Sequence, residues 1–311
     1  MPTYLVGSRA SNLAKAQVRE YLAPVRERFP HAAFTHRVIL EGGDKDRSSL
    51  TSDVSATSGG SAFSTEQQAA LARGDVDVVV HSMKDLPTEN PPGLMLLPPP
   101  GREDVRDALC GSTLAGLRKG ARVGTGAARR IAQLLAVRPD LEVVPIRGNV
   151  PPRLKKIETM GLDAVLLAAA GLHRLGLDDA IGELLPLDLF PPSPGQGALG
   201  IQVREDNEAV RTMLCTVGDY EVDACVRAER ALLGELHGGC SVPVGAYAET
   251  GPNGTLMLHA QVTSPDGAGR VSGSMTGPAD EPEKLGMDLG KELIDRGARE
   301  VLAGLRGFVQ A

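Results

Sequence analysis

Cationic side chains follow the predicted strands of this sequence at five places, and such side chains bind carboxylates and phosphates in proteins. The seven residues are Arg9, Lys84, Arg129, Arg130, Arg147, Arg153 and Arg174. Ligands of open parallel sheets bind beyond the carboxyl ends of the strands, where helix N-termini also favour anions. A single arginine at such a place is usually a solvated or salt-bridged surface residue. Because seven cations share this place, we favour a site for a ligand with several negative charges.

Asp85 is the only carboxylate among the cations at these predicted strand ends, directly after Lys84. It could be a structural partner of an arginine. In a site for a polyanion, an additional negative charge is also explained by proton transfer or by stabilisation of a positive charge. His81, at the end of the same strand, could act as a base or be a packed, hydrogen-bonded histidine. Asp85 is therefore the candidate catalytic residue, with the structural reading still open.

Cys240 lies in a glycine-rich loop, His237-Gly238-Gly239-Cys240, between a predicted helix and a predicted strand. A cysteine in a flexible loop is a better candidate for covalent chemistry than one in a core. The other three cysteines, at 110, 215 and 225, lie in predicted core or helix contexts, where an inert thiol is the usual state. The cysteine spacing is not that of a zinc site, so we expect no metal.

The elements that position these residues alternate between strand and helix over the first 204 residues, the pattern of a sheet covered by helices. The predicted strands are 4–6, 34–40, 76–80, 121–123, 141–146, 163–169 and 199–204, and the predicted helices are 11–28, 65–73, 127–137 and 151–160. Ser11 or Asn12 is the expected N-cap of the first helix. Residues 41–64 are rich in Ser, Gly and Asp, which predicts a mobile loop.

Two proline-rich segments interrupt this alternation: residues 87–100 are interpreted as a linker or domain edge, and residues 191–195 as a second boundary. After residue 220 the pattern changes to one long helix, three strands and a final helix. These elements are predicted at 222–236, 243–249, 255–263, 269–275 and 281–296. Their order indicates a separate α+β domain. The sequence shows no evident internal repeat.

The composition excludes several classes of function. The chain has 311 residues with 33 Lys plus Arg against 39 Asp plus Glu, and only 3% aromatic residues. Nucleic-acid binding usually needs basic surfaces and stacking aromatics, so we expect no nucleic-acid partner. We find no signal peptide and no apolar run that could span a bilayer, which predicts no membrane partner. With only four cysteines, we expect reduced thiols and a cytoplasmic location.

The acidic residues are unevenly distributed along the chain. Residues 195–311 hold 10 basic and 17 acidic side chains, whereas residues 100–194 hold 13 basic and 11 acidic ones. The middle of the chain is therefore the region in which an anion site is most expected, although this small excess alone decides nothing.

The same segments resemble the porphobilinogen deaminase family, whose members are also called hydroxymethylbilane synthases, over nearly the whole chain. The matching stretches are Gly7-Ser8-Arg9 with Gln17, residues 80–88, residues 101–108, Val123-Gly124-Thr125 with Arg129-Arg130, Ile146-Arg147-Gly148-Asn149, residues 170–176, Pro194-Gly195-Gln196-Gly197-Ala198 and Gly238-Gly239-Cys240. So many motifs in one order are far more specific than any one of them alone.

The resemblance implies an α/β fold of three domains. The first two would resemble periplasmic binding proteins, with mixed, largely parallel sheets, and the second would be inserted into the first. The third would be a small C-terminal α+β domain that carries the cofactor cysteine. The implied boundaries are 1–98 with 195–217 for the first domain, 99–194 for the second and 218–311 for the third.

The resemblance also implies an activity, the head-to-tail condensation of four porphobilinogen molecules to the linear tetrapyrrole hydroxymethylbilane, with loss of ammonia. Cys240 would hold a dipyrromethane cofactor through a thioether, and Asp85 would stabilise positive pyrrole nitrogens and pass protons. The residues implied to bind the cofactor are Cys240, Lys84, Arg129, Arg130 and Arg147. Those implied to bind the substrate are Arg9, Ser11, Arg153, Arg174 and Gln196. Members of the family would act as monomers on this small molecule, without a metal.

The chain departs from the family pattern at two places. Family members usually have Gly-Gly-Lys-Gly in a lid over the site, whereas this chain reads Ser58-Gly59-Gly60-Ser61. Two serines usually follow the Gly-Thr motif, whereas this chain has Gly126 and Ala127. Each lost hydrogen bond to a charged group is worth about 1.5–3 kcal/mol. Two alternatives therefore stay open, a divergent paralogue acting on a pyrrole in specialised metabolism and a non-catalytic polycarboxylate-binding protein.

Overall fold

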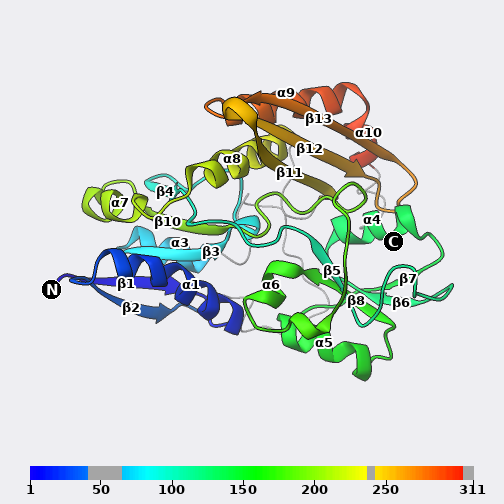
Figure 1. Ribbon diagram of the computed structural model, residues 1–311, viewed down its shortest axis with the longest axis horizontal. Helices are drawn as coiled ribbons and strands as arrows, with labels where there is room; N and C mark the ends of the chain where they lie inside the picture. The colour runs from blue at the N-terminus through cyan, green and yellow to red at the C-terminus, as the bar shows by residue number, and fades with distance from the viewer. Residues whose placement is uncertain (41–64, 237–241, 304–311) are drawn as a thin grey trace. The chain divides into compact units, whose positions relative to one another are not determined.

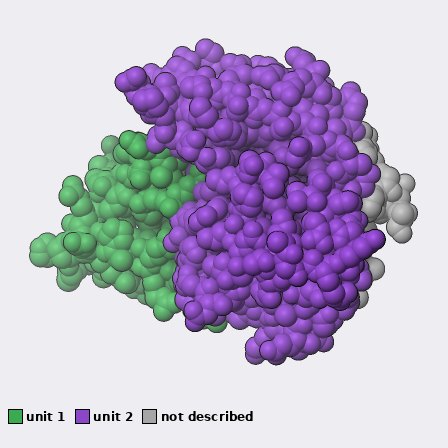
Figure 2. Space-filling view, turned by 45° about the vertical axis from the view of Figure 1, so that its right-hand side comes forward, with its two compact units in different colours: residues 1–102, 198–223 green, residues 103–197, 224–311 purple. Residues whose placement is uncertain are grey.

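The structure is a computed structural model that describes residues 1–40, 65–236 and 242–303. The chain divides into two compact units, which Figure 2 shows in different colours. The first unit comprises Met1–Arg102 and Ala198–Asp223, and the second comprises Glu103–Gly197 and Ala224–Ala311. The division into three domains, with the boundaries given above, stays a prediction.

The first unit contains a five-stranded sheet in the order β2-β1-β3-β10-β4 (Figure 1). Its strands are β1 (Thr3–Ser8), β2 (Ala33–Val38), β3 (Val78–Ser82), β4 (Leu94–Leu97) and β10 (Leu199–Arg204). β1, β2 and β3 are parallel, and β10 runs antiparallel to both β3 and β4. The described helices of this unit are α1 (Asn12–Arg28), α3 (Thr65–Ala72) and α7 (Glu208–Cys215).

One strand of this unit was not predicted. Within the segment 87–100, interpreted as a linker or domain edge, Leu94–Leu97 form β4 and pair with β10. Prolines flank this strand on both sides, and they obscured its signal in the sequence. Because β4 is an edge strand, such prolines are tolerated. Its four residues are all large and apolar, and Leu94 and Leu97 are buried.

β3 is the central strand that leads to the candidate site, and it is buried on both faces. Val78 and Val80 pack with Tyr21 of α1, whereas Val79 packs with Leu71 of α3. Successive side chains of a strand point to opposite faces, so α1 and α3 cover opposite faces of the sheet. This explains the uninterrupted run of valines in the sequence, which is typical of a doubly covered strand.

The second unit contains a five-stranded sheet in the order β7-β6-β8-β5-β9. Its strands are β5 (Asp107–Cys110), β6 (Arg122–Gly124), β7 (Glu142–Val144), β8 (Ala164–Ala168) and β9 (Ile181–Leu184), and the helices beside it are α4 (Ala128–Val137), α5 (Val150–Thr159) and α6 (Ala169–His173). β6, β7 and β8 are parallel, and β5 runs antiparallel to β8 and β9. Each large sheet thus has four strands that run in one direction and one antiparallel strand, β10 or β5, which lies next to an edge strand. The sequence does not show this repeat of topology.

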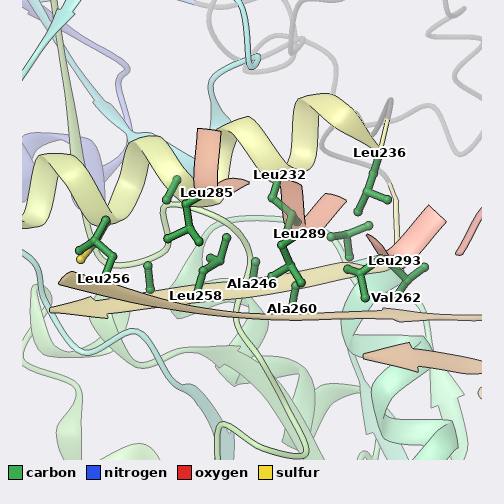
Figure 3. Packing of buried hydrophobic residues seen from close by; sticks show 14 of the residues in the cluster. Leu232, Leu236, Ala246, Leu256, Leu258, Ala260, Val262, Leu285, Leu289 and Leu293 are labelled. Atoms are coloured by element: carbon green, nitrogen blue, oxygen red, sulfur yellow. The ribbon is translucent and has the colours of Figure 1, made fainter. Parts of the chain in front are cut away.

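The C-terminal part of the second unit is a three-stranded antiparallel sheet with helices packed on it. Its elements are β11 (Val244–Gly251), β12 (Thr255–Thr263), β13 (Arg270–Pro278), α9 (Pro282–Asp295), α10 (Ala298–Ala303) and α8 (Tyr220–Glu235), whose first four residues belong to the first unit. Figure 3 shows Leu285, Leu289 and Leu293 of α9 between the helices and the strands. Their spacing of four residues places them on one helix face.

These observations confirm the predicted fold class, an α/β fold with two mixed, largely parallel sheets and a small C-terminal α+β part. Within the described ranges, no helix combines the length and the apolar character that a membrane crossing requires.

Candidate functional site

The first unit brings Arg9 and the Lys84-Asp85 pair to the same edge of its sheet. β1 and β3 are parallel neighbours, with Val6 beside Val78 and Gly7 beside Val79. Arg9 follows the end of β1 directly, and a short 3-10 turn, Met83–Asp85, follows the end of β3. The carboxyl ends of parallel neighbours lie at one edge, so three of the predicted site residues share it.

The turn that carries Asp85 is anchored at both ends. Met83 and Leu86 are buried, the Met83 N–H donates to the carbonyl of Ala198, and the Leu86 N–H donates to the carbonyl of Met83. Lys84 and Asp85, between the anchors, are half-buried. The turn thus holds a carboxylate and an ammonium group in fixed backbone positions with partial access to solvent, as acid–base chemistry on a bound ligand requires.

Ser11, another predicted site residue, caps α1. Its hydroxyl accepts a hydrogen bond from the Ala14 N–H at 3.1 Å, which is the geometry of an N-cap serine. Only Arg9 and Ala10 separate this cap from the end of β1. Arg9 therefore lies in a short connection with a fixed element on each side.

His81 shows the features of a packed histidine. It is 5% exposed on β3, and burial lowers the pKa of its imidazole to about 4, with the positive charge of Arg9 acting in the same direction. A ring that stays neutral at pH 7 and titrates so low is a weak base for proton transfer near neutral pH. Of the two readings, the structure favours the packed core residue.

The second unit brings the remaining predicted arginines to the carboxyl edge of its own sheet. Thr125 follows β6, Arg147 follows β7 after a short connection, and Arg174 is the C-cap of α6, which begins directly after β8. Arg147 is exposed, and Arg153 is half-buried in the first turns of α5. Arg174 is also half-buried and donates to the carbonyl of Gly197 at 2.9 Å.

Arg129 and Arg130 behave differently, because both side chains are buried against Asp107. Each arginine is 5% exposed and the carboxylate is fully buried. Nη1 of Arg129 lies 2.8 Å from Oδ2 of Asp107, and Nη2 of Arg130 lies 2.8 Å from Oδ1. Gln196, also buried, donates to the same Oδ1 at 2.9 Å. Three predicted site residues therefore converge on one carboxylate.

This cluster is strongly electrostatic. Burial alone would raise the pKa of Asp107, but the two guanidinium groups outweigh it and hold the pKa far below its usual range. Two cations and one anion leave the buried trio with a net charge of +1. In a low-dielectric interior, such an excess favours an anionic ligand nearby.

Asp107 is the site residue that sequence reasoning missed, and the statement that Asp85 is the only carboxylate among these cations is wrong. β5 was not predicted, because its four residues, Asp107-Ala108-Leu109-Cys110, carry no periodicity. β5 is antiparallel, so Asp107 at its start pairs with Ala168 at the end of β8. A strand that runs the opposite way begins at the edge where its parallel neighbours end. Two signals could have indicated it: the family motif at residues 101–108, which contains Asp107, and an acidic residue just before a short apolar run.

The beginning of α4 is suited to an anion. Its N-cap, Ala127, offers no side-chain hydrogen bond, so the first N–H groups of the helix have no capping side chain. The hydroxyl of Thr125 is buried and has no hydrogen-bond partner within the described ranges. A Cβ atom at Gly126 would lie 2.4 Å from the carbonyl oxygen of Ile146. The backbone at Ile146, just before Arg147, is therefore close enough to Gly126 to require a glycine there.

Cys240 and the Ser58-Gly59-Gly60-Ser61 segment lie outside the described residues. Among the other three cysteines, Cys110 and Cys225 are buried, as predicted for core residues, and Cys215 is half-buried. Burial raises the pKa of the Cys110 thiol to about 11, which keeps it protonated at neutral pH. Of the four cysteines, Cys240 therefore stays the candidate for covalent chemistry.

Comparison with known proteins identifies the relatives of this chain. Residues 4–212 match the model of the family described as porphobilinogen deaminase, dipyromethane cofactor binding domain, and residues 224–295 match porphobilinogen deaminase, C-terminal domain. The porphobilinogen deaminase of Geotalea uraniireducens is 46% identical over 305 residues, which cover 97% of this chain and 95% of that protein. That of Desulforudis audaxviator is 43% identical, with 97% of both chains covered.

Among solved structures, the L-cystine solute receptor of Neisseria gonorrhoeae is 15% identical with a TM-score of 0.41, covering 70% of this chain and 85% of the receptor. A probable amino-acid transporter binding protein of Bacillus subtilis is 14% identical with the same TM-score, covering 70% of this chain and 90% of that protein. The match of the two family models and the identity over nearly the full length show that the chain belongs to the porphobilinogen deaminase family.

Proposed function

We propose that this chain joins four porphobilinogen molecules head to tail, with loss of ammonia at each step, and so forms the linear tetrapyrrole hydroxymethylbilane. The observation that carries this proposal is the match to both family models, over residues 4–212 and 224–295. Each porphobilinogen carries one acetate and one propionate group, so the growing product is a polycarboxylate. Several arginines at the carboxyl edges of the two large sheets suit such a ligand.

Cys240 would hold the dipyrromethane cofactor of this family, which supplies the free α-carbon to which the first substrate is joined. The described residues near the start of α4 fit its carboxylates: the buried Thr125 hydroxyl without a partner, the uncapped helix N-terminus and the net positive charge of the Asp107 trio. In this role Arg129 and Arg130 would act from within the buried trio, and Lys84 and Arg147 would approach the cofactor from less buried positions.

Asp85 would be the catalytic carboxylate. When ammonia leaves porphobilinogen, the pyrrole nitrogen becomes positively charged, and a carboxylate held nearby stabilises this charge. The same group can accept the proton that the joined ring loses and pass it on. Its position in the anchored turn after β3 supports this role, because the buried side chains of Met83 and Leu86 fix the backbone on both sides.

The substrate carboxylates would be bound by residues that are at least partly accessible. Arg9, Ser11, Arg153 and Arg174 are all half-buried. Gln196, in contrast, is 1% exposed and donates to Asp107 and to the carbonyl of Val105. We therefore assign Gln196 a contribution to the substrate site through Asp107 rather than through direct contact.

We infer further that the protein acts as a monomer in the cytoplasm. The family resemblance and the free thiols at positions 110 and 215 support this inference. Size-exclusion chromatography with light scattering tests the oligomeric state directly.

The activity is tested by incubating the purified protein with porphobilinogen and following both substrate consumption and the chain length of the product. The proposal predicts a four-ring linear product. Consumption with a different product, or a cofactor without consumption, would favour the divergent paralogue. The observation that supports this second function is that Gly126 and Ala127 stand where the family usually has two serines, so two hydroxyl groups are missing beside the site.

A further inference from the structure

His36 of β2 makes a contact beside the end of β1 that none of the roles above uses. Its Nε2 lies 2.8 Å from Oγ of Ser8, and the same Oγ donates to the carbonyl oxygen of Arg9 at 3.0 Å. β1 and β2 are parallel with Val6 beside His36. Ser8 lies two residues beyond Val6, so the side chains of Ser8 and His36 are on the same face of the sheet.

The directions of these hydrogen bonds follow from the number of protons. A hydroxyl carries one proton, and Ser8 uses it toward the carbonyl of Arg9. With the Ser8 proton directed to the Arg9 carbonyl, the Ser8 oxygen accepts from His36, and this arrangement requires the neutral tautomer that is protonated at Nε2. Burial lowers the pKa of His36, and the nearby Lys15 lowers it further, so the ring is neutral near pH 7. The line of donors therefore runs from His36 through Ser8 to the backbone of Arg9.

These hydrogen bonds lie in the short connection between β1 and the N-cap of α1. The carbonyl of Ser8 accepts from the Ile39 N–H at 2.8 Å, so strand pairing continues to the last residue of β1. Ser11 then caps α1. Ser8 is fully buried, and a buried hydroxyl holds its partners firmly because water cannot replace them. The bond to the Arg9 carbonyl therefore fixes the backbone from which the Arg9 side chain starts.

We propose that His36 is a positioning residue for Arg9, acting through the Ser8 hydroxyl. The inference rests on the proposed function, in which Arg9 binds a carboxylate of porphobilinogen. If His36 loses its donor, the Ser8 hydroxyl can turn away from Arg9, and the guanidinium is then less well placed for the substrate. The chemistry itself, at Asp85, is unaffected.

The kinetic test uses the cofactor-loaded enzyme with porphobilinogen as the variable substrate. His36→Leu should raise KM about fivefold, the effect of one net hydrogen bond, with kcat nearly unchanged. His36→Gln, which keeps a donor at similar reach, should restore KM. His31→Leu, a change of an exposed histidine, is the matched control. In an Arg9→Ala background, His36→Leu should have no further effect, because contacts that act through one residue are not additive.

A second measurement makes the failure of this inference distinguishable from the failure of the proposed function. Nitrogen NMR of the histidine rings should show His36 protonated at Nε2 at pH 7.5 and changed by Ser8→Ala. Protonation at Nδ1 instead, or an unchanged KM in a folded His36→Leu variant, would overturn the positioning role. An Arg9→Ala variant with the KM of the wild type would instead refute the assignment of Arg9 to the substrate, whichever tautomer His36 shows.

Discussion

Replacing Asp107 by asparagine should destabilise the second unit strongly. The change keeps the shape of the side chain but removes the charge that two buried arginines share, so the net charge of the trio rises from +1 to +2. Removing one partner of a buried ion pair costs about 3–5 kcal/mol of unfolding free energy. Asp107 is 0% exposed, so solvent does not screen this loss. With about 2–4 °C per kcal/mol for units of this size, we expect the melting temperature to fall by roughly 6–20 °C.

The pH dependence of the same variant gives a second check. The pKa of Asp107 is depressed in the folded protein, so its stabilising effect is complete above the pKa of the unfolded chain and is lost as the pH falls through the folded pKa. The difference in melting temperature between wild type and Asp107→Asn should therefore be constant from pH 5 to 8 and shrink only below about pH 4.

Asp140→Asn is the matched control for this prediction. Asp140 also pairs with an arginine, Arg138 at 2.8 Å, but both side chains are partly exposed. We expect a much smaller fall in melting temperature there, because solvent screens such pairs. Calorimetry of the three proteins in one buffer provides the comparison. If Asp107→Asn melts no lower than Asp140→Asn, the buried trio does not stabilise the unit and our electrostatic reasoning is wrong.

Three further predictions concern other parts of the site. Asp85→Asn should lower kcat by at least about a hundredfold with an unchanged melting temperature; normal turnover would exclude the role of Asp85. Ala127→Ser should stabilise the protein by about 0.5–2 kcal/mol, because serine adds an N-cap to α4. Gly126→Ser should destabilise it by about 1–3 kcal/mol, because the Ile146 backbone must move to make room for the side chain. Thermal melts that rank the two variants in the reverse order would contradict the described turn. Glu229→Gln should lower the free energy of unfolding by about 1–3 kcal/mol, because the buried carboxylate accepts hydrogen bonds from the N–H groups of Gly195 and Ala248. Denaturant unfolding measures this change, and an unchanged free energy of unfolding would contradict the prediction.

The order of elements that leads to the site could be predicted from the sequence where the periodic signal is strong. The run at 76–80 predicts a buried strand, and β3 occupies 78–82 with Asp85 in the turn that follows. The Ser11 cap and α1 are likewise confirmed. Local signals suffice here because β-branched valines favour the strand β3 and the capping serine Ser11 favours the start of α1.

The partners of the arginines could not be predicted in the same way. Arg129 and Arg130 were predicted beyond a strand end as ligands for an anion. The sequence does not reveal that β5 enters the sheet antiparallel and brings Asp107 to them. Short strands such as β5 and β9 have four residues each, too few for a periodic pattern. Their pairing depends on packing against neighbouring strands, and these long-range contacts cannot be read from the local sequence.

Intact-protein mass after a brief exposure to porphobilinogen tests the central claim most directly. The account predicts a cofactor-bearing protein and a ladder of up to four equal additions, each the mass of porphobilinogen less ammonia. It also predicts that Cys240→Ser shows neither the cofactor nor the ladder. A wild-type protein that keeps the mass of the bare chain after reconstitution, or a Cys240→Ser variant that still carries the ladder, would contradict the account.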